Sequence, residues 1–130
     1  MFCSFKNMKE NIILSGAPLI ELQYCKLNKK SKTKKIVSAN KINFLKDDSL
    51  YLSIDDTEKF DINYGDIIYG GTYSNLKSGK VDWFGVNYFS LQQLVDIIDK
   101  IEEYKPLDYE ILLDWLKQGL NYNGFYILGV

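Results

Sequence analysis

The chain of 130 residues contains no histidine and no arginine, and it has only two cysteines and two prolines. Without histidine, the commonest proton shuttle near neutral pH is absent, and so are the Ser-His and Cys-His pairs of nucleophilic catalysis. Without arginine, there is no planar guanidinium to bind a phosphate or a carboxylate through two parallel hydrogen bonds. These absences leave few ways to build an active site, so we expect a protein that is not an enzyme and carries no cofactor.

The two cysteines, Cys3 and Cys25, are too few for a structural zinc site in a chain without histidine. Lys26 follows Cys25, but neighbouring residues of a strand point to opposite faces, so we do not expect it to activate the thiol. Two thiols without a secretory leader are typical of a reducing compartment. No apolar run approaches the roughly 20 residues that a membrane-spanning helix needs. We therefore expect a cytoplasmic protein without a metal site or a membrane partner.

What the chain has in abundance is charge, and this charge is divided between two parts. All sixteen basic residues are lysines, and ten of them fall in residues 1–46 with only Glu10 and Glu21, a formal charge of +8. Residues 47–130 hold six lysines and fifteen carboxylates, a formal charge of −9. An acidic region of this size attracts cationic partners and speeds their association. The run at residues 28–35 has lysines without arginine or aromatic residues, which predicts a solvated loop and no nucleic-acid partner.

Length and composition predict one domain over residues 1–130, because 46% apolar and 25% charged residues are ordinary for a globular chain. Alternation of apolar and polar residues indicates about six strands, separated by short polar turns. One turn is expected at Ser78-Gly79, between two strands that pair as a hairpin. The expected strands before the helices cover residues 12–14, 19–27, 36–45, 50–54, 60–73 and 81–89.

The pattern becomes helical at Ser90. Ser90 and Gln93 form a capping-box signature, and the apolar residues that follow recur at helical spacing. These residues are Leu91, Leu94, Val95, Ile98 and Ile101. Pro106 suits the first position of a second helix, which we expect to end at Gly119. The side chains expected to face inward from that helix are Leu107, Ile111, Leu112, Trp115 and Leu116.

Residues 124–130 (GFYILGV) indicate a final, largely buried strand. The sequence therefore predicts an α+β fold. In it, a mainly antiparallel sheet of about six strands carries two short C-terminal antiparallel helices packed on one face and ends with a C-terminal strand. Leu107, Trp115 and the final strand suit a dimer interface as well as a core, so the sequence leaves the oligomeric state open.

The candidate partner-binding residues come from the acidic part of the chain. Four carboxylates crowd an expected turn and the start of the following strand, and two more fall on strands that we expect to be adjacent. A solvated acidic face explains such residues as readily as a protein-binding surface does. The candidate contacts are Asp55, Asp56, Glu58, Asp61, Asp66 and Asp82, and the candidate aromatic anchors beside them are Tyr64, Tyr69 and Tyr73.

The C-terminal part resembles a known class of protein. From Asp82 it reads DWFGVNYFSLQQLVDIIDKIEEYKPLDYEILLDWLKQ and closes with NGFYILGV. These segments are similar to small bacterial immunity proteins, which are encoded beside polymorphic toxins, including contact-dependent growth inhibition systems. The resemblance implies a cytoplasmic inhibitor whose partner is the toxic C-terminal domain of a cognate toxin, with a nuclease-like, cationic surface. None of the matching segments is a catalytic signature, so no residue role is carried over by position.

Two other functions are compatible with the residues. A small hydrolase would use paired carboxylates as acid and base, with or without a divalent ion. A non-catalytic ligand- or protein-binding module would have no toxin partner, and its basic residues 26–46 could then contact RNA.

Overall fold

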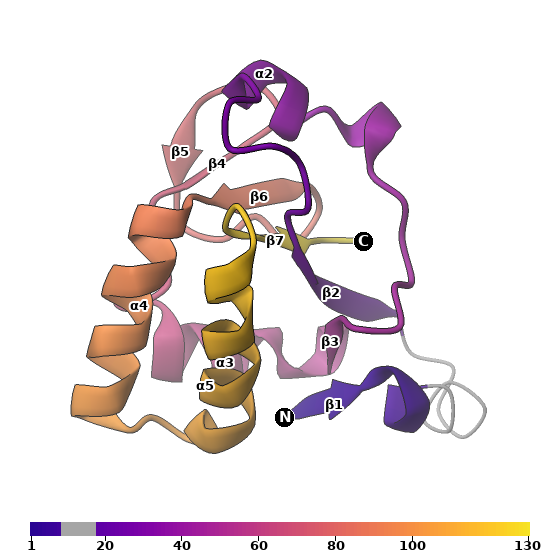
Figure 1. The fold of residues 1–130 in the computed structure, drawn as a ribbon. Helices are drawn as coiled ribbons and strands as arrows, with labels where there is room; N and C mark the ends of the chain where they lie inside the picture. The colour runs from indigo at the N-terminus through magenta and orange to yellow at the C-terminus, as the bar shows by residue number, and fades with distance from the viewer. Residues whose placement is uncertain (9–17) are drawn as a thin grey trace.

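The computed structural model describes residues 1–8 and 18–130, and in it the chain has an α+β fold (Figure 1). Its sheet has seven strands in the order β1-β3-β2-β7-β6-β4-β5, and every pairing is antiparallel. The strands are β1 (Phe2–Ser4), β2 (Leu19–Tyr24), β3 (Leu50–Ser53), β4 (Gly71–Thr72), β5 (Ser78–Gly79), β6 (Val86–Phe89) and β7 (Phe125–Leu128). The predicted fold class is confirmed, and the C-terminal strand β7 is the central one.

The helices differ greatly in length. The described helices are α2 (Thr33–Ile36), α3 (Thr57–Tyr64), α4 (Leu91–Tyr104) and α5 (Tyr109–Gln118), with 3₁₀ turns η1 (Ala39–Lys41), η2 (Ile54–Asp56) and η3 (Gly119–Asn121). Residues 5–8 are also helical. The two long helices α4 and α5 lie side by side, as expected for the C-terminal pair (Figure 1).

Strand alternation divides the buried residues between the two faces of the sheet. On one face, which we call the helical face, Leu22 and Ile127 pack with Phe60 of α3, Leu94 of α4 and Leu116 of α5. The other face is covered by residues 26–46, which we call the lysine-rich segment. There, a smaller cluster is formed by Cys25, Ile36, Val37, Val86, Tyr88, Tyr126 and Leu128. Figure 1 shows α2 of this segment on the far side of β6 and β7 from α3, α4 and α5.

The start of α4 is as predicted. The Ser90 side chain accepts a hydrogen bond from the Gln93 backbone N–H at 3.2 Å, and the Gln93 side chain accepts one from the Ser90 N–H at 2.9 Å. Leu94, Ile98 and Ile101 are buried as expected. Val95 is exposed and Ile97 is buried, so the apolar side of α4 is turned slightly from the expected one.

The second helix begins three residues later than predicted. Asp108 has φ of +57°, a left-handed conformation outside the helical region, so α5 begins only at Tyr109. Leu107 and Ile111 are exposed, contrary to expectation. The remaining inward-facing residues, Leu112, Trp115 and Leu116, are buried as predicted. The helix ends at Gln118, and Gly119 has right-handed geometry and leads into η3.

The prediction of a strand over residues 36–45 is wrong. This stretch contains the end of α2, the turn η1 and an irregular segment. Its backbone N–H groups at Leu45 and Lys46 donate to the buried carboxylate of Glu21, at 2.7 and 3.0 Å. Because a side chain takes these donors, they do not pair with a neighbouring strand.

The prediction of a strand over residues 60–64 is also wrong, because they belong to α3. Phe60 and Tyr64 are buried, and a separation of four residues fits one face of a strand or of a helix. Ile62 distinguishes the two, because a strand would bury it with them, whereas a helix turns it to the opposite side. Ile62 is 77% exposed.

The expected hairpin exists, but its turn and strands are displaced. Ser78 and Gly79 form β5, and the turn lies at residues 73–77, where the Tyr73 N–H donates to the Lys77 carbonyl at 2.8 Å. Only residues 71–72 of the expected strand over 60–73 and residues 86–89 of the expected strand over 81–89 are strand. The expected strand at residues 12–14 lies outside the described residues.

Candidate functional site: an acidic helix and an adjoining turn

Five of the six candidate carboxylates lie on or directly after one helical run. Asp55 and Asp56 belong to η2, Glu58 and Asp61 belong to α3, and Asp66 lies in the turn after α3. The only basic residue between them is Lys59, whose ammonium lies 4.0 Å from an oxygen of Asp56. With five carboxylates and one lysine, residues 54–66 carry a formal charge of −4.

The packing of α3 determines which residues face solvent. Phe60 and Tyr64 point into the core, where their rings stack with centroids 5.1 Å apart. Phe60 also meets the Trp83 ring edge to face at 5.2 Å. Helical periodicity then turns Glu58, Asp61 and Ile62 outward, and all three are exposed.

Asp82 lies in a turn beside α3, and not on a strand as predicted. Its carboxylate accepts the Phe84 backbone N–H at 2.9 Å, and its own N–H donates to the Asn87 side-chain oxygen at 2.7 Å. The next residue, Trp83, donates its indole N–H to the Asp61 carboxylate at 3.2 Å. Residues 82–85 are thereby joined to α3, so Asp82 and Asp61 belong to neighbouring parts of one surface.

Two apolar residues that the sequence analysis missed are exposed on these same elements. Ile62 lies next to Asp61 on α3, and Phe84 follows Trp83 in the turn; each is 77% exposed. Ile62 could have been found from the sequence by reading residues 57–64 as a helix, because Ile62 then lies opposite the inward-facing Phe60. We call the six candidate carboxylates together with Ile62 and Phe84 the acidic surface.

The three candidate tyrosines differ in accessibility. Tyr64 is fully buried, and its hydroxyl donates to the Leu107 carbonyl, so it is corrected from a surface anchor to a core residue. Burial also raises the pKa of Tyr64, because the charged phenolate would be desolvated. Tyr73 is half-buried and donates to the Lys80 carbonyl within the hairpin. Tyr69 is 63% exposed and is the accessible anchor among the three.

A groove opens where the acidic surface meets the end of α4. It has a volume of about 540 Å³. Its walls combine apolar and charged side chains, and Tyr104 on its rim is exposed. The lining residues are Ile62, Asn63, Asp66, Ile67, Lys100, Tyr104 and Pro106. Because Ile62 and Asp66 belong to both, the groove is continuous with the acidic surface.

The described residues form neither a metal-binding cluster nor a helix that could span a membrane. Within residues 1–8 and 18–130, no three His, Cys, Asp or Glu side chains are grouped so that they could hold a metal ion. Over the same residues, no helix has the length and apolar character needed to span a membrane. What the acidic surface offers chemically is a set of hydrogen-bond acceptors and negative charges around exposed apolar side chains.

No protein-family model matches this chain, and neither the curated proteins nor the solved structures include a match.

Proposed function

We propose that this protein is an immunity protein, which binds the cationic toxic domain of a cognate bacterial toxin through its acidic surface and neutralises it. The observation that carries this proposal is the grouping of carboxylates with two apolar residues that are each about three-quarters exposed, Ile62 and Phe84. Carboxylates attract a cationic partner and orient it, whereas apolar side chains contribute affinity when they are buried at the interface.

At 77% exposed each, Ile62 and Phe84 are the most exposed large apolar residues among those that the structure describes. A side chain of this size gains roughly 1.5–3 kcal/mol when it is moved from water into a packed environment. Ile62 and Phe84 do not contribute this free energy in the free protein, because they are exposed. A partner that buried them would gain it as binding free energy. The groove beside Ile62 adds a hollow that could receive a side chain from the partner.

Electrostatic complementarity explains how such a surface could inhibit an enzyme without chemistry of its own. A nuclease needs a cationic cleft because its substrate is a polyanion. In a well-studied nuclease–inhibitor pair, close charge pairs couple by about 1.5–7 kcal/mol each. A few such pairs, with buried apolar contacts between them, are sufficient for tight inhibition.

Co-expression tests the proposal directly. The C-terminal domain of the protein encoded immediately upstream is induced in a bacterial host with and without this chain, and growth and co-purification are followed. We expect this chain to restore growth and to co-purify with the toxic domain. A toxic domain that kills regardless, or that does not bind this chain, would contradict the proposal.

A charge-reversal pair then tests the acidic surface itself. The double variant Glu58→Lys/Asp66→Lys changes two exposed carboxylates that make no ion pair with the described residues. We expect it to slow association at least tenfold at low salt. The matched control Asp99→Lys/Asp114→Lys makes the same charge change on the outer sides of α4 and α5. Equal effects of both variants would remove the acidic surface from the proposal.

A further inference from the structure

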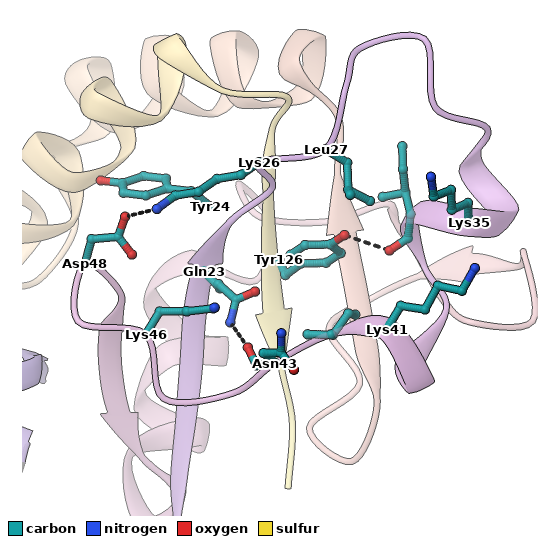
Figure 2. A pocket seen from close by; sticks show the side chains of 12 residues that line it. Gln23, Tyr24, Lys26, Leu27, Lys35, Lys41, Asn43, Lys46, Asp48 and Tyr126 are labelled. Carbon is teal, nitrogen blue, oxygen red and sulfur yellow. Dashed lines mark hydrogen bonds and ion pairs between the residues drawn. The ribbon is translucent and has the colours of Figure 1, made fainter.

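A second hollow lies on the face of the sheet opposite α3, α4 and α5, where the lysine-rich segment crosses β2 and β7 (Figure 2). Its volume is about 240 Å³. It is separate from the acidic surface, and the proposed immunity function does not use it. The residues that line it are Gln23, Tyr24, Lys26, Leu27, Lys35, Ile36, Lys41, Ile42, Asn43, Lys46, Asp48 and Tyr126. We call this hollow the basic pocket.

One wall of the basic pocket is fixed by a buried carboxylate. Glu21 of β2 is only 4% exposed. It accepts hydrogen bonds from the Leu45 and Lys46 N–H groups and, at 2.6 Å, from the Ser49 hydroxyl. The neighbouring Gln23 donates its amide to the Asn43 carbonyl at 2.7 Å. These bonds hold residues 43–49 against the sheet. The backbone of Lys46 is therefore fixed at the edge of the pocket.

The opposite wall is fixed by bonds to α2. The Tyr126 hydroxyl donates to the Ile36 carbonyl at 2.7 Å, and the Ser74 hydroxyl donates to the Val37 carbonyl at 3.0 Å. Ile36 and Val37 are themselves buried against the sheet. The backbone on both sides of the pocket is therefore held before any ligand arrives, which lowers the ordering cost of binding.

The charges around the pocket are strongly unbalanced. Four lysines line it, and among the described lining residues Asp48 is the single carboxylate. Asp48 is already paired with Lys26 at 2.6 Å. Lys35, Lys41 and Lys46 form no ion pair with any described residue. The charged lining residues sum to +3, and the buried carboxylate of Glu21 behind the wall lowers this to +2. Figure 2 shows Lys46 reaching towards Gln23 from one side, with Lys35 and Lys41 on the other and the Lys41 side chain extended away from Gln23. An anion in the hollow is attracted by all three lysines, and Lys41 would have to turn inward to contact it.

We propose that the basic pocket binds the phosphate group of a small soluble phosphate ester. Lysine ammonium groups bind phosphate as compact point charges, and this does not require the arginine that the chain lacks. Three unpaired lysines match a dianionic phosphate better than a singly charged carboxylate. The volume lies below the roughly 300–1,000 Å³ that is usual for drug-sized ligands, so the pocket accepts a small anion or the charged end of a larger one.

Two exposed apolar residues lie in the chain between the lining residues Asn43 and Lys46, and a ligand larger than phosphate could reach them. Phe44 and Leu45, which follow the lining residue Asn43, are each more than half exposed. A strip of lysines interleaved with stacking aromatics would suit a single-stranded nucleic acid, but here the unpaired lysines surround one hollow. The arrangement therefore favours a small ligand with one phosphate group.

The full chain is titrated with adenosine monophosphate, inorganic phosphate and adenosine to test this proposal. Binding is monitored through amide chemical shifts in NMR spectra and through calorimetry. We expect the two phosphate-bearing probes to bind and to shift the amides of residues 41–46, and we expect adenosine not to bind. Added salt should weaken binding. The absence of shifts with both phosphate probes would overturn the proposal.

Two isosteric variants separate the pocket from general charge effects. Asn43→Asp adds one negative charge at the pocket, whereas Asn40→Asp adds the same charge outside its lining. We expect Asn43→Asp to weaken phosphate binding about tenfold and Asn40→Asp to leave it nearly unchanged. The pair Lys41→Gln/Lys46→Gln and Lys29→Gln/Lys30→Gln repeats the comparison by removing lysines. If the pocket variant and its control lose the same phosphate affinity in either comparison, the net charge of the protein, and not the pocket, determines phosphate binding.

Two further probes distinguish other sources of phosphate. A single-stranded oligonucleotide that binds much more tightly than the monophosphate, with shifts spread over residues 28–35, would replace a small ligand by a nucleic acid. Binding only to vesicles of phosphatidylcholine with phosphatidylserine would point to a lipid headgroup. Either result would overturn the proposal of a small soluble ester. The proposal is supported if the chain binds adenosine monophosphate but shows neither tighter binding to the oligonucleotide nor binding to the vesicles.

Discussion

The acidic surface and the basic pocket lie on different faces of one sheet, and they differ in shape as well as in charge. The acidic surface follows the outer side of α3, exposes Ile62 and Phe84, and borders a wide groove at Ile62. The basic pocket is a small hollow whose walls are held by hydrogen bonds to Glu21 and Tyr126. The carboxylates of residues 55–66 and the lysines of the basic pocket, which are separated along the chain, thus also lie on different faces. The surroundings of each then suggest a protein partner in one case and a small anion in the other.

The two regions also rest on different kinds of interaction. Behind the acidic surface, α3 is held by the large apolar cluster of the helical face, including Phe60 and Tyr64. Around the basic pocket the apolar cluster is small, and buried polar bonds hold the chain in position. The basic side should therefore be more sensitive to changes in protonation and hydrogen bonding than the acidic side.

Alkaline pH provides the largest expected effect on this difference. Burial raises the pKa of Tyr88 to about 12, and it also raises the pKa values of Tyr24, Tyr51, Tyr64 and Tyr126. Above pH 10 the unfolded chain loses phenolic protons that the folded chain retains, so the free energy of unfolding falls with rising pH. The slope is about 1.4 kcal/mol per pH unit for each such tyrosine.

Stability should therefore be unaffected by these groups below about pH 10 and should decrease from there towards pH 12. Urea denaturation at pH 8, 10 and 11 measures the effect. Tyr51, Tyr88 and Tyr126 lie on the face that carries the lysine-rich segment, so the protection of amides from hydrogen exchange, relative to their intrinsic rate at each pH, should fall there before it falls in α4. Equal stability at pH 8 and 11 would contradict the assignment of buried tyrosines.

A single substitution at Glu21 has the next largest expected effect. Glu21→Gln keeps the shape of the side chain but removes the charge that accepts the Leu45 and Lys46 N–H groups. We expect the free energy of unfolding to fall by about 2 kcal/mol, because charge-assisted hydrogen bonds are lost in a buried site. Urea denaturation measures the total change, and hydrogen exchange locates it.

The location of the effect sharpens the comparison between the two regions. Exchange of the Leu45 and Lys46 amides should accelerate in Glu21→Gln, and exchange in α3 should change little. The control Glu58→Gln removes a carboxylate from the exposed side of α3 and should change stability by less than about 0.5 kcal/mol. A uniform acceleration across both regions would mean that Glu21 supports the whole sheet and not the pocket wall alone.

The sequence predicted most reliably those elements whose signals are local. The capping residues Ser90 and Gln93 and the helical spacing after them identified α4, and the apolar run at the C-terminus identified β7. The errors at residues 36–45 and 60–64 have physical causes. Phe60 and Tyr64 fit two periodicities. At the end of the strand-like stretch, the Leu45 N–H donates to the side chain of Glu21, 24 residues earlier, and not to a neighbouring strand.

The same distinction applies to the two sites. Charge counting found the carboxylates of the acidic surface, because five of them lie within twelve residues of one another along the chain. It missed Ile62 and Phe84, since their exposure depends on the orientation of α3 and on the turn at residues 82–85. The basic pocket was not predicted, because its walls depend on Glu21 and Tyr126, whose partners are distant in sequence.

The smallest expected effect concerns the backbone at the edge of the basic pocket. Leu45 has φ of +64°, a left-handed conformation that costs a leucine about 1–2 kcal/mol, and its side chain is mostly exposed. Asparagine tolerates this conformation better, so Leu45→Asn should raise the free energy of unfolding by about 0.5–1 kcal/mol. Leu76→Asn, at φ of +69° in the hairpin turn, is a matched control outside both regions and should give a similar gain.

Because both substitutions should raise stability similarly, ligand binding is the measurement that distinguishes Leu45 from Leu76. If Leu45 supports the organic part of a phosphate ester, Leu45→Asn should weaken binding of adenosine monophosphate but not of inorganic phosphate. Leu76→Asn should affect neither. Calorimetry on the two variants measures both quantities in the same samples. If Leu45→Asn binds both probes with unchanged affinity, the pocket contacts only the phosphate group. The role of Leu45 would then be structural: its backbone connects Asn43, which is held by Gln23, to the N–H groups that are held by Glu21.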